Sequence, residues 1–370
     1  MFQLDSNFEN GKKFYCGRIC VADLNGSFFD MGRQYGALMQ KELEKVYRFV
    51  CANQDGFKYR DLLGSRGTLV CGFRKYDEFF RGMSETSGFD LEQLLLINAV
   101  EVVYLDKLTG SMRDIFDASR CSSLAVNGSL TGNGNCVIGR NYDWLPEFEK
   151  IADTLVLTVF HPSDGSNAAA SFNWCGCLYM TTGMNSAGIY LGLNSGMFAD
   201  KNFCSDRVHN VWLLWEMLWN CSDLEMVKLC FNTFRSAAGY VITGASAGEM
   251  ECFQWHTQGQ WLAAPRSGSG NMIASANHFA SPGWENDPLA GDDTIASSVQ
   301  RRENLIAQAE KYNRISPVEM MEILSVPYAD GGAKVRGTMF QIAADVERKE
   351  WYIRTCLMNE WAHIPLAEIL

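Results

Sequence analysis

Residues 120–144 read RCSSLAVNGSLTGNGNCVIGRNYDW. Two short β-like runs, 122–126 and 136–140, flank a turn rich in Gly and Asn, which is the signature of a β-hairpin. Antiparallel pairing returns the end of the second run to the start of the first, so we expect Arg140 and Asp143 to lie near Cys121. A neighbouring guanidinium lowers the pKa of a thiol. The pattern therefore indicates either a nucleophilic cysteine or a surface hairpin with an Arg–Asp ion pair.

The predicted secondary structure differs on the two sides of this hairpin. The residues before it are predicted to be mostly helical, with one helix capped by Asp30 and another beginning at Asp90. The residues after it alternate short strands with helices. The predicted strands are 154–160, 178–182, 188–193, 240–243, 250–255, 272–275, 338–343 and 351–356, and the predicted helices are 208–234 (split at Ser222-Asp223), 295–312 and 317–324. This order favours an α+β fold of stacked antiparallel sheets and helices over a doubly wound parallel sheet.

The net charge and the distribution of apolar residues disfavour some classes of function. The 370 residues carry a net charge of -11, which disfavours nucleic-acid binding. No apolar stretch is long enough to span a bilayer, and Met1–Lys13 lacks the pattern of a signal peptide. We therefore expect a soluble, cytoplasmic protein that binds neither nucleic acid nor membrane.

The 13 cysteines are an odd number and, without a secretory signal, do not predict a disulfide framework. No Cys/His spacing predicts a metal site, and most of the cysteines are expected to be small buried hydrophobic residues. Tryptophans near 144, 174 and 212–219 could line an apolar acyl pocket, although core packing is the commoner role.

The motif Cys121-Ser122 followed by Gly139-Arg140-Asn-Tyr-Asp143 resembles the choloylglycine hydrolase and penicillin V acylase families. With its long leader, the chain is most similar to the acyl-coenzyme A:6-aminopenicillanic acid acyltransferase family of N-terminal-nucleophile (Ntn) hydrolases. Four further segments resemble family motifs and occur in the family's order: 26–36, 183–194, 276–279 and 297–301.

The resemblance implies a four-layer αββα sandwich of two antiparallel sheets flanked by helices, in which residues 1–120 (the leader) and 121–370 (the catalytic segment) form one compact domain. It implies that the Arg120–Cys121 bond is cut by the protein itself, and that the chain needs neither cofactor nor metal. The implied roles are nucleophile and α-amine base for Cys121, thiolate stabilisation for Arg140, amine orientation for Asp143, oxyanion donors for Asn194 and Asn277, and charge stabilisation for Arg301.

The implied substrate is a small-molecule N-acyl amide, whose linear, non-peptide C–N bond is cleaved through a thioester. Whether water or an amine accepts the acyl group stays open, as does assembly into a homo-oligomer. The alternatives are a Cys–His thiol hydrolase and a non-catalytic, thiol-rich binding protein. At single positions, Arg302 could replace Arg301 in the match, Asn194 and Asn277 could be turn residues, and Asn185 and His278 are expected to be structural.

Overall fold

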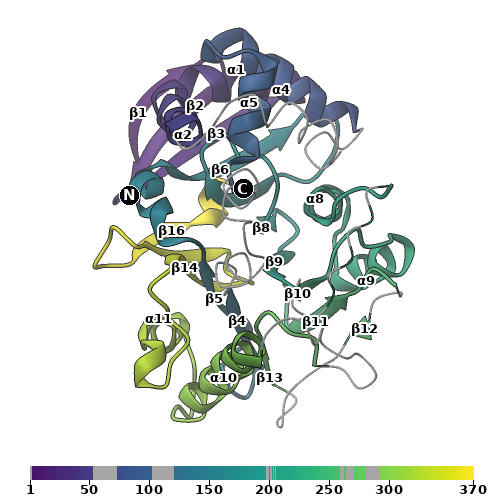
Figure 1. Ribbon diagram of the computed structural model, residues 1–370, viewed down its shortest axis with the longest axis vertical. Helices are drawn as coiled ribbons and strands as arrows, with labels where there is room; N and C mark the ends of the chain where they lie inside the picture. The colour runs from purple at the N-terminus through teal and green to yellow at the C-terminus, as the bar shows by residue number, and fades with distance from the viewer. Residues whose placement is uncertain are drawn as a thin grey trace.

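The computed structural model describes residues 2–52, 73–101, 121–196, 200, 202, 204, 206–258, 262–263, 271–280 and 292–370. Two sheets lie in the middle of the molecule (Figure 1). Helices of the leader gather at one end and α10 and α11 at the other, with α8 and α9 to one side. This is an α+β architecture with two sheets flanked by helices, as the sequence predicted.

The larger sheet has ten strands, and the leader supplies three of them. Neighbouring strands pair antiparallel except β3 and β6, which pair in parallel from Cys20–Val156 to Gly26–Pro162. The leader is therefore part of the same sheet as strands from residues 121–370. The order is β1 (Phe2–Phe8), β2 (Gly11–Cys16), β3 (Ile19–Gly26), β6 (Leu155–Pro162), β7 (Ala169–Trp174), β8 (Thr182–Asn185), β9 (Tyr190–Ser195), β10 (Tyr240–Ser246), β11 (Glu249–Trp255) and β12 (Leu262–Ala263).

The smaller sheet is entirely antiparallel and contains the predicted hairpin. Its order is β13 (Met272–Ser275), β4 (Ser122–Gly128), β5 (Gly134–Asp143), β14 (Thr338–Asp345), β15 (Glu350–Thr355) and β16 (Ala362–Pro365).

Helices cover the outer faces of both sheets. Helix α1 packs on β2 and β3, α8 and α9 pack on β8, β10 and β11, and α10 and α11 pack on β4, β5, β13 and β14. The helices are α1 (Phe28–Leu38), α2 (Gln40–Ala52), α4 (Arg74–Ser87), α5 (Leu91–Asn98), α8 (Asn210–Asn220), α9 (Leu224–Thr233), α10 (Asp292–Ala309) and α11 (Pro317–Ser325), with 3-10 turns η1 (Pro146–Thr154), η2 (Tyr328–Asp330) and η3 (Leu366–Glu368).

Three expectations about local structure need correction. The strands β1 to β3 were not predicted, and a strand predicted at 178–182 is replaced by β8, which starts at Thr182. The cap of α1 is Ser27, because its side chain accepts from the Asp30 amide while the Asp30 carboxylate accepts from the Ser27 amide. Asp30 is therefore the third helical residue of a capping box. The turns predicted near Gly64 and Gly67 lie outside the described residues.

Close helix packing explains two glycines of the leader motif. A Cβ on Gly32 would lie 2.0 Å from the Phe79 carbonyl oxygen, and one on Gly82 would lie 2.0 Å from the Phe29 carbonyl oxygen. Gly36 faces the backbone of α4 in the same way, since a Cβ there would lie 2.5 Å from the Met83 carbonyl oxygen. Because no side chain fits between them, α1 and α4 are in backbone contact.

The hairpin strands β4 and β5 are buried on both faces. Ala125 and Ile138 belong to the main core, whereas Leu124, Val126 and Val137 belong to a second core that α10 and α11 cover. Alternation along β4 therefore places Cys121 and Ser123 on the Ala125 face.

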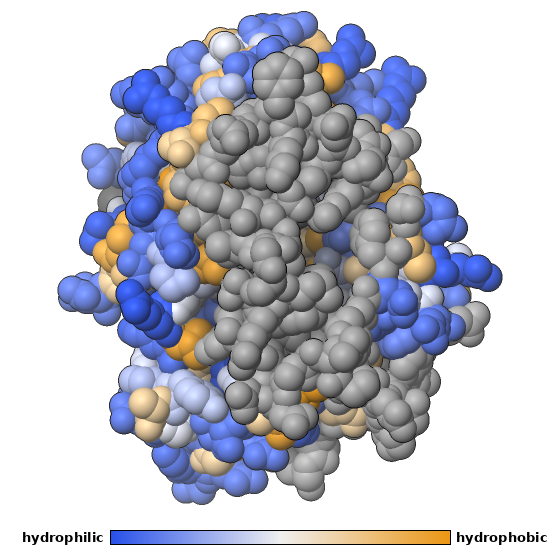
Figure 2. Space-filling model, viewed as in Figure 1, coloured by the Kyte–Doolittle hydropathy of each residue, from blue (hydrophilic) through white to orange (hydrophobic). Residues whose placement is uncertain are grey.

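Polar residues predominate around the described rim in Figure 2, with small apolar patches between them. In the described ranges, no helix has the length and hydropathy of a membrane span. Most of the described cysteines are buried and all are free, as predicted for small hydrophobic residues.

Candidate active site

Cys121 immediately precedes β4 and is 5% exposed. The strand pairs with β5 so that Ser122 faces Asn141 and Ser123 faces Arg140. The Cys121 Sγ lies 3.8 Å from the backbone oxygen of Asp143, at the end of β5. The hairpin therefore brings Arg140 and Asp143 back to Cys121, as expected from the sequence. Arg120 lies outside the described residues.

Arg140 links the two sheets. Its side chain is fully buried, and Nη1 donates to Asn194 Oδ1 on β9 over 2.9 Å. Nη2 donates to the backbone oxygen of Leu193 in a short hydrogen bond. The Nε–H is buried without a hydrogen-bond partner among the described residues.

Asp143 is buried at the strand end, where its Oδ1 accepts from Thr338 Oγ1 over 2.6 Å. Thr338 in turn accepts from the backbone amide of Val335 over 3.0 Å. Because the threonine hydroxyl is oriented by that amide, the carboxylate is held in one position at the end of β5, where its charge acts on the Cys121 thiol.

The side-chain amides of Asn194 and Asn277 both donate hydrogen bonds within the protein. Asn194 Nδ2 donates to Ser275 Oγ over 3.1 Å, and Asn277 Nδ2 donates to the Ser195 carbonyl over 2.8 Å. Both side chains are fully buried, in contrast to ordinary turn residues. An oxyanion role would therefore require either Nδ2 group to share its hydrogens with the substrate.

Arg301, on α10, connects Cys121 to Asn277. Its Nη1 donates to the Cys121 carbonyl over 3.0 Å and its Nη2 donates to Asn277 Oδ1 over 3.0 Å. The alternative match, Arg302, donates instead from Nε to the Ala274 carbonyl over 3.0 Å. Of the two arginines, it is therefore Arg301 that binds Cys121, so the geometry favours Arg301 as the match to the family motif.

Burial raises the pKa of the Cys121 thiol, and the Asp143 charge adds to this rise. The charges of Arg140 and Arg301 and the contact with the Asp143 backbone oppose it. In the uncut chain the thiol is therefore protonated near neutral pH, with both cations close enough to stabilise a thiolate.

Sequence reasoning missed Glu101, which comes from the leader and is 6% exposed. Its carboxylate accepts from the hydroxyl of Tyr142, between Arg140 and Asp143 on β5. The position belongs to an apolar helical pattern, and nothing in that pattern marks a residue near the nucleophile.

The histidines have partners of their own. His161 lies 2.9 Å from Asp23, His256 lies 3.3 Å from Asp200, and His278 Nδ1 lies 2.8 Å from Ser298 Oγ. His209 lies 3.2 Å from the Tyr240 hydroxyl, and His363 stacks on Tyr352. These contacts give a Cys–His mechanism no support.

Asn185 has the structural role that its sequence context predicted. Its Nδ2 donates to the carbonyls of Leu218 and Cys221, and its Oδ1 accepts from the Ile189 amide. It therefore closes the turn between β8 and β9 and holds the end of α8.

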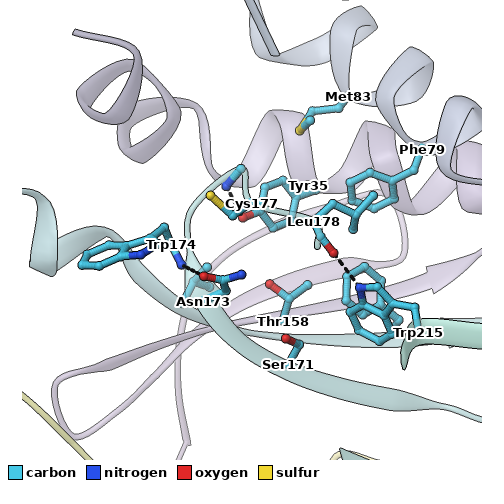
Figure 3. Close-up of a pocket in the computed structure, with 13 residues that line it drawn as sticks. Tyr35, Phe79, Met83, Thr158, Ser171, Asn173, Trp174, Cys177, Leu178 and Trp215 are labelled. Carbon is cyan, nitrogen blue, oxygen red and sulfur yellow. Dashed lines mark hydrogen bonds between the residues drawn. The ribbon is translucent and has the colours of Figure 1, made fainter. Parts of the chain in front are cut away.

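A separate pocket lies under the leader helices (Figure 3). Tyr35 from α1 and Phe79 and Met83 from α4 lie opposite Thr158 and Ser171 of the large sheet, and Trp174 and Trp215 also line it. The 13 lining residues do not include Cys121. Trp212 and Trp219 are buried in the core.

No family model and no curated protein matches this chain. Among solved structures, the chain is similar to the N-acylethanolamine-hydrolyzing acid amidase ortholog of Caenorhabditis elegans, with 14% identity over 61% of this chain and 92% of that one and a TM-score of 0.45. It is similar to conjugated bile acid hydrolase from Clostridium perfringens, with 11% identity, coverage of 67% and 93%, and a TM-score of 0.46. It is also similar to penicillin V acylase from Agrobacterium tumefaciens, with 14% identity, coverage of 67% and 87%, and a TM-score of 0.41. At these TM-scores the case for a function rests on the chain's own residues.

Proposed function

We propose that this protein is a self-processing N-terminal-nucleophile cysteine hydrolase or acyltransferase that cleaves the amide bond of N-acylated small molecules. The observation that carries the proposal is the convergence on Cys121 of the residues that the sequence motifs single out. Asp143 and Arg301 contact Cys121 itself, and Arg301 continues to Asn277. Arg140 faces Ser123 across the hairpin and binds Asn194.

The first reaction is the cut that creates the enzyme. The Cys121 thiol attacks the carbonyl carbon of Arg120, the C–N bond breaks, and the acyl group passes from nitrogen to sulfur. Water then hydrolyses this thioester, which releases the Arg120 carboxylate and leaves Cys121 with a free thiol and a free α-amine. Arg301, through the Cys121 carbonyl, holds the residue while its preceding bond reacts.

The second reaction is turnover. Before the cut, the Cys121 nitrogen is an amide and cannot accept a proton near neutral pH. After the cut it is an amine with an ordinary pKa of about 8, suited to take the thiol proton and pass it to the leaving amine. The sulfur forms a thioester with the acyl group, and water or an acceptor amine then releases it. Arg140 stabilises the thiolate, and Asp143 orients the amine.

A time course on one purified sample tests this proposal. The larger fragment is expected to begin Cys-Ser-Ser-Leu, and product from a panel of N-acyl amino acids, penicillins and acyl-amines is expected to form in proportion to the cut. Cys121→Ala is expected to abolish both reactions. Product formation at full rate by an uncut chain would favour the Cys–His alternative, and an inert, uncut chain would favour the thiol-rich binding protein.

A further inference from the structure

The Glu101 carboxylate is bound by three donors, and all three belong to the catalytic segment. The Tyr142 hydroxyl donates to Oε1 in a short hydrogen bond, and Trp174 Nε1 donates to the same oxygen over 2.8 Å. The Tyr179 hydroxyl donates to Oε2 over 2.5 Å. A side chain of the leader thus occupies a buried polar site whose hydrogen-bond donors all lie C-terminal to the proposed cleavage point.

Of these three donors, Tyr142 lies nearest to Cys121 in the chain of contacts, because it touches Arg140 and precedes Asp143. One face of its ring stacks on Phe340 with 4.4 Å between ring centroids and 6° between planes. The Arg140 guanidinium carbon lies 5.6 Å from the same ring centroid. Tyr142 also precedes Asp143, whose backbone oxygen lies 3.8 Å from Cys121 Sγ. Fixing the Tyr142 hydroxyl therefore fixes the surface on which Arg140 rests.

Each of the three groups around the carboxylate carries a hydrogen that it can donate to a Glu101 oxygen. The pKa of Glu101 lies above its usual value, because burial raises it by more than the three donors and the Arg140 charge lower it. The other titratable groups around the carboxylate are the phenols of Tyr142 and Tyr179 and the thiol of Cys177, whose pKa values burial raises. Among the described residues, Arg140 is the cation whose charge acts on this carboxylate.

The leader is expected to stay in place when the chain is cut after residue 120. Its strand β3 is hydrogen-bonded between β2 and β6 inside the ten-stranded sheet, and its helix α1 packs on β2 and β3. These contacts do not depend on the 120–121 bond, so Glu101 remains available to the processed protein.

We propose that Glu101 is a positioning residue of the active site that the leader supplies: it anchors the Tyr142 hydroxyl, and Tyr142 holds the Arg140 guanidinium in the orientation that serves Cys121. This inference rests on the proposed function. It makes the catalytic segment incomplete without the leader, even after the cut.

The sharpest test compares Tyr142→Phe with Tyr179→Phe in the processed enzyme. Each variant removes one phenol donor from the same carboxylate, but of the two tyrosines it is Tyr142 whose ring lies against Arg140. We expect Tyr142→Phe to lower kcat about tenfold with KM within about twofold, as for the loss of one hydrogen bond to a charged group. Tyr179→Phe is expected to lower kcat clearly less than Tyr142→Phe does, because it leaves the hydrogen bond between Tyr142 and the carboxylate in place. Equal effects of the two variants would show a purely structural carboxylate and overturn the inference.

A second comparison uses the carboxylate itself. Glu101→Gln is expected to lower kcat as Tyr142→Phe does, and adding Tyr142→Phe to it is expected to have little further effect. The matched control is Glu216→Gln, because Glu216 also accepts from a tyrosine hydroxyl, that of Tyr76 at 2.8 Å, at a place where it supports α8 and α4. If Glu101→Gln does not fold, the Tyr142/Tyr179 comparison decides alone. Wild-type protein that neither cuts nor hydrolyses would refute the proposed function, whereas an active wild type with an unaffected Tyr142→Phe would refute only the role of Glu101.

Discussion

Arg301 Nη1 donates to the backbone carbonyl of Cys121 across 180 positions of sequence, over 3.0 Å. This bond ties the start of β4 to α10, and the other arm of the same guanidinium holds Asn277. A planar fork can bind two oxygens at once, which a single ammonium cannot do with the same geometry. The bond between Arg301 and Cys121 is thus a contact through which α10 fixes the position of Cys121.

Arg301→Lys is therefore expected to slow self-cleavage by roughly tenfold or more and to lower the free energy of unfolding by about 2 kcal/mol, because a single ammonium leaves at least one of the two buried acceptors without its charged donor. Densitometry of the two fragments over time and urea unfolding measure the two effects. Arg302→Lys is the matched control, since Arg302 binds the Ala274 carbonyl and is partly exposed. Equal slowing by both variants would contradict the assignment of Arg301.

Cys121 is expected to react slowly with iodoacetamide in the uncut chain, because the thiol is buried and burial raises its pKa. Cys230 is half-buried, and a hydrogen bond from Cys221, with 3.8 Å between the sulfurs, lowers its pKa. Of the described cysteines, Cys230 and the exposed Cys51 should therefore label before Cys121 in the uncut chain, and Cys121 should become the fastest after the cut.

Peptide mapping after brief labelling at neutral pH measures this reversal. Arg140→Gln is expected to slow the labelling of Cys121 in the processed protein more than Arg302→Gln does, since Arg140 is the strongest of the charges that favour the thiolate. Fast labelling of Cys121 in the uncut chain would contradict the prediction.

Asp143→Asn is expected to lower kcat by about 100-fold with little change in KM, because a neutral amide orients the Cys121 amine poorly. Thr338→Val removes the hydroxyl that donates to Asp143 over 2.6 Å and should have a smaller effect in the same direction. Steady-state kinetics of the processed variants separates kcat from KM. A rise in KM at unchanged kcat would assign Asp143 to substrate binding.

Gly192→Ala is expected to disturb the site through Arg140. A Cβ there would lie 3.0 Å from the Tyr190 hydroxyl and 3.3 Å from Arg140 Nη1. Both atoms would have to shift, and activity should fall about tenfold while stability falls by no more than about 2 kcal/mol. Adding Tyr190→Phe removes the closer atom and should restore part of the activity. Failure of this double variant to recover would place the strain elsewhere.

The two fragments are expected to stay together after the cut, because β3 is paired on both sides and α1 packs on the same sheet. Size-exclusion chromatography of processed protein should give one peak containing both fragments. Fragments that separate without denaturant would contradict the prediction and would leave the site without Glu101.

The sequence by itself determined the features that depend on near neighbours. The β4–β5 hairpin follows from two short β-like runs around a Gly/Asn turn, and its register brings Arg140 and Asp143 to Cys121. The capping boxes at Asp90 and Ser316 are equally local, because each cap and its partner are three residues apart.

Only the tertiary structure decided what depends on distant neighbours. The first strand has mostly exposed residues and no clear alternation, and β3 gains its place by pairing with β6, which lies far later in the chain. Arg301 and Arg302 are adjacent in sequence, and the orientation of α10 against the small sheet decides which one reaches Cys121. Glu101 is buried by three aromatic donors that come from separate parts of the catalytic segment. Such contacts have no local signal, because a side chain's partner across a core is set by the packing of whole elements rather than by its own sequence context.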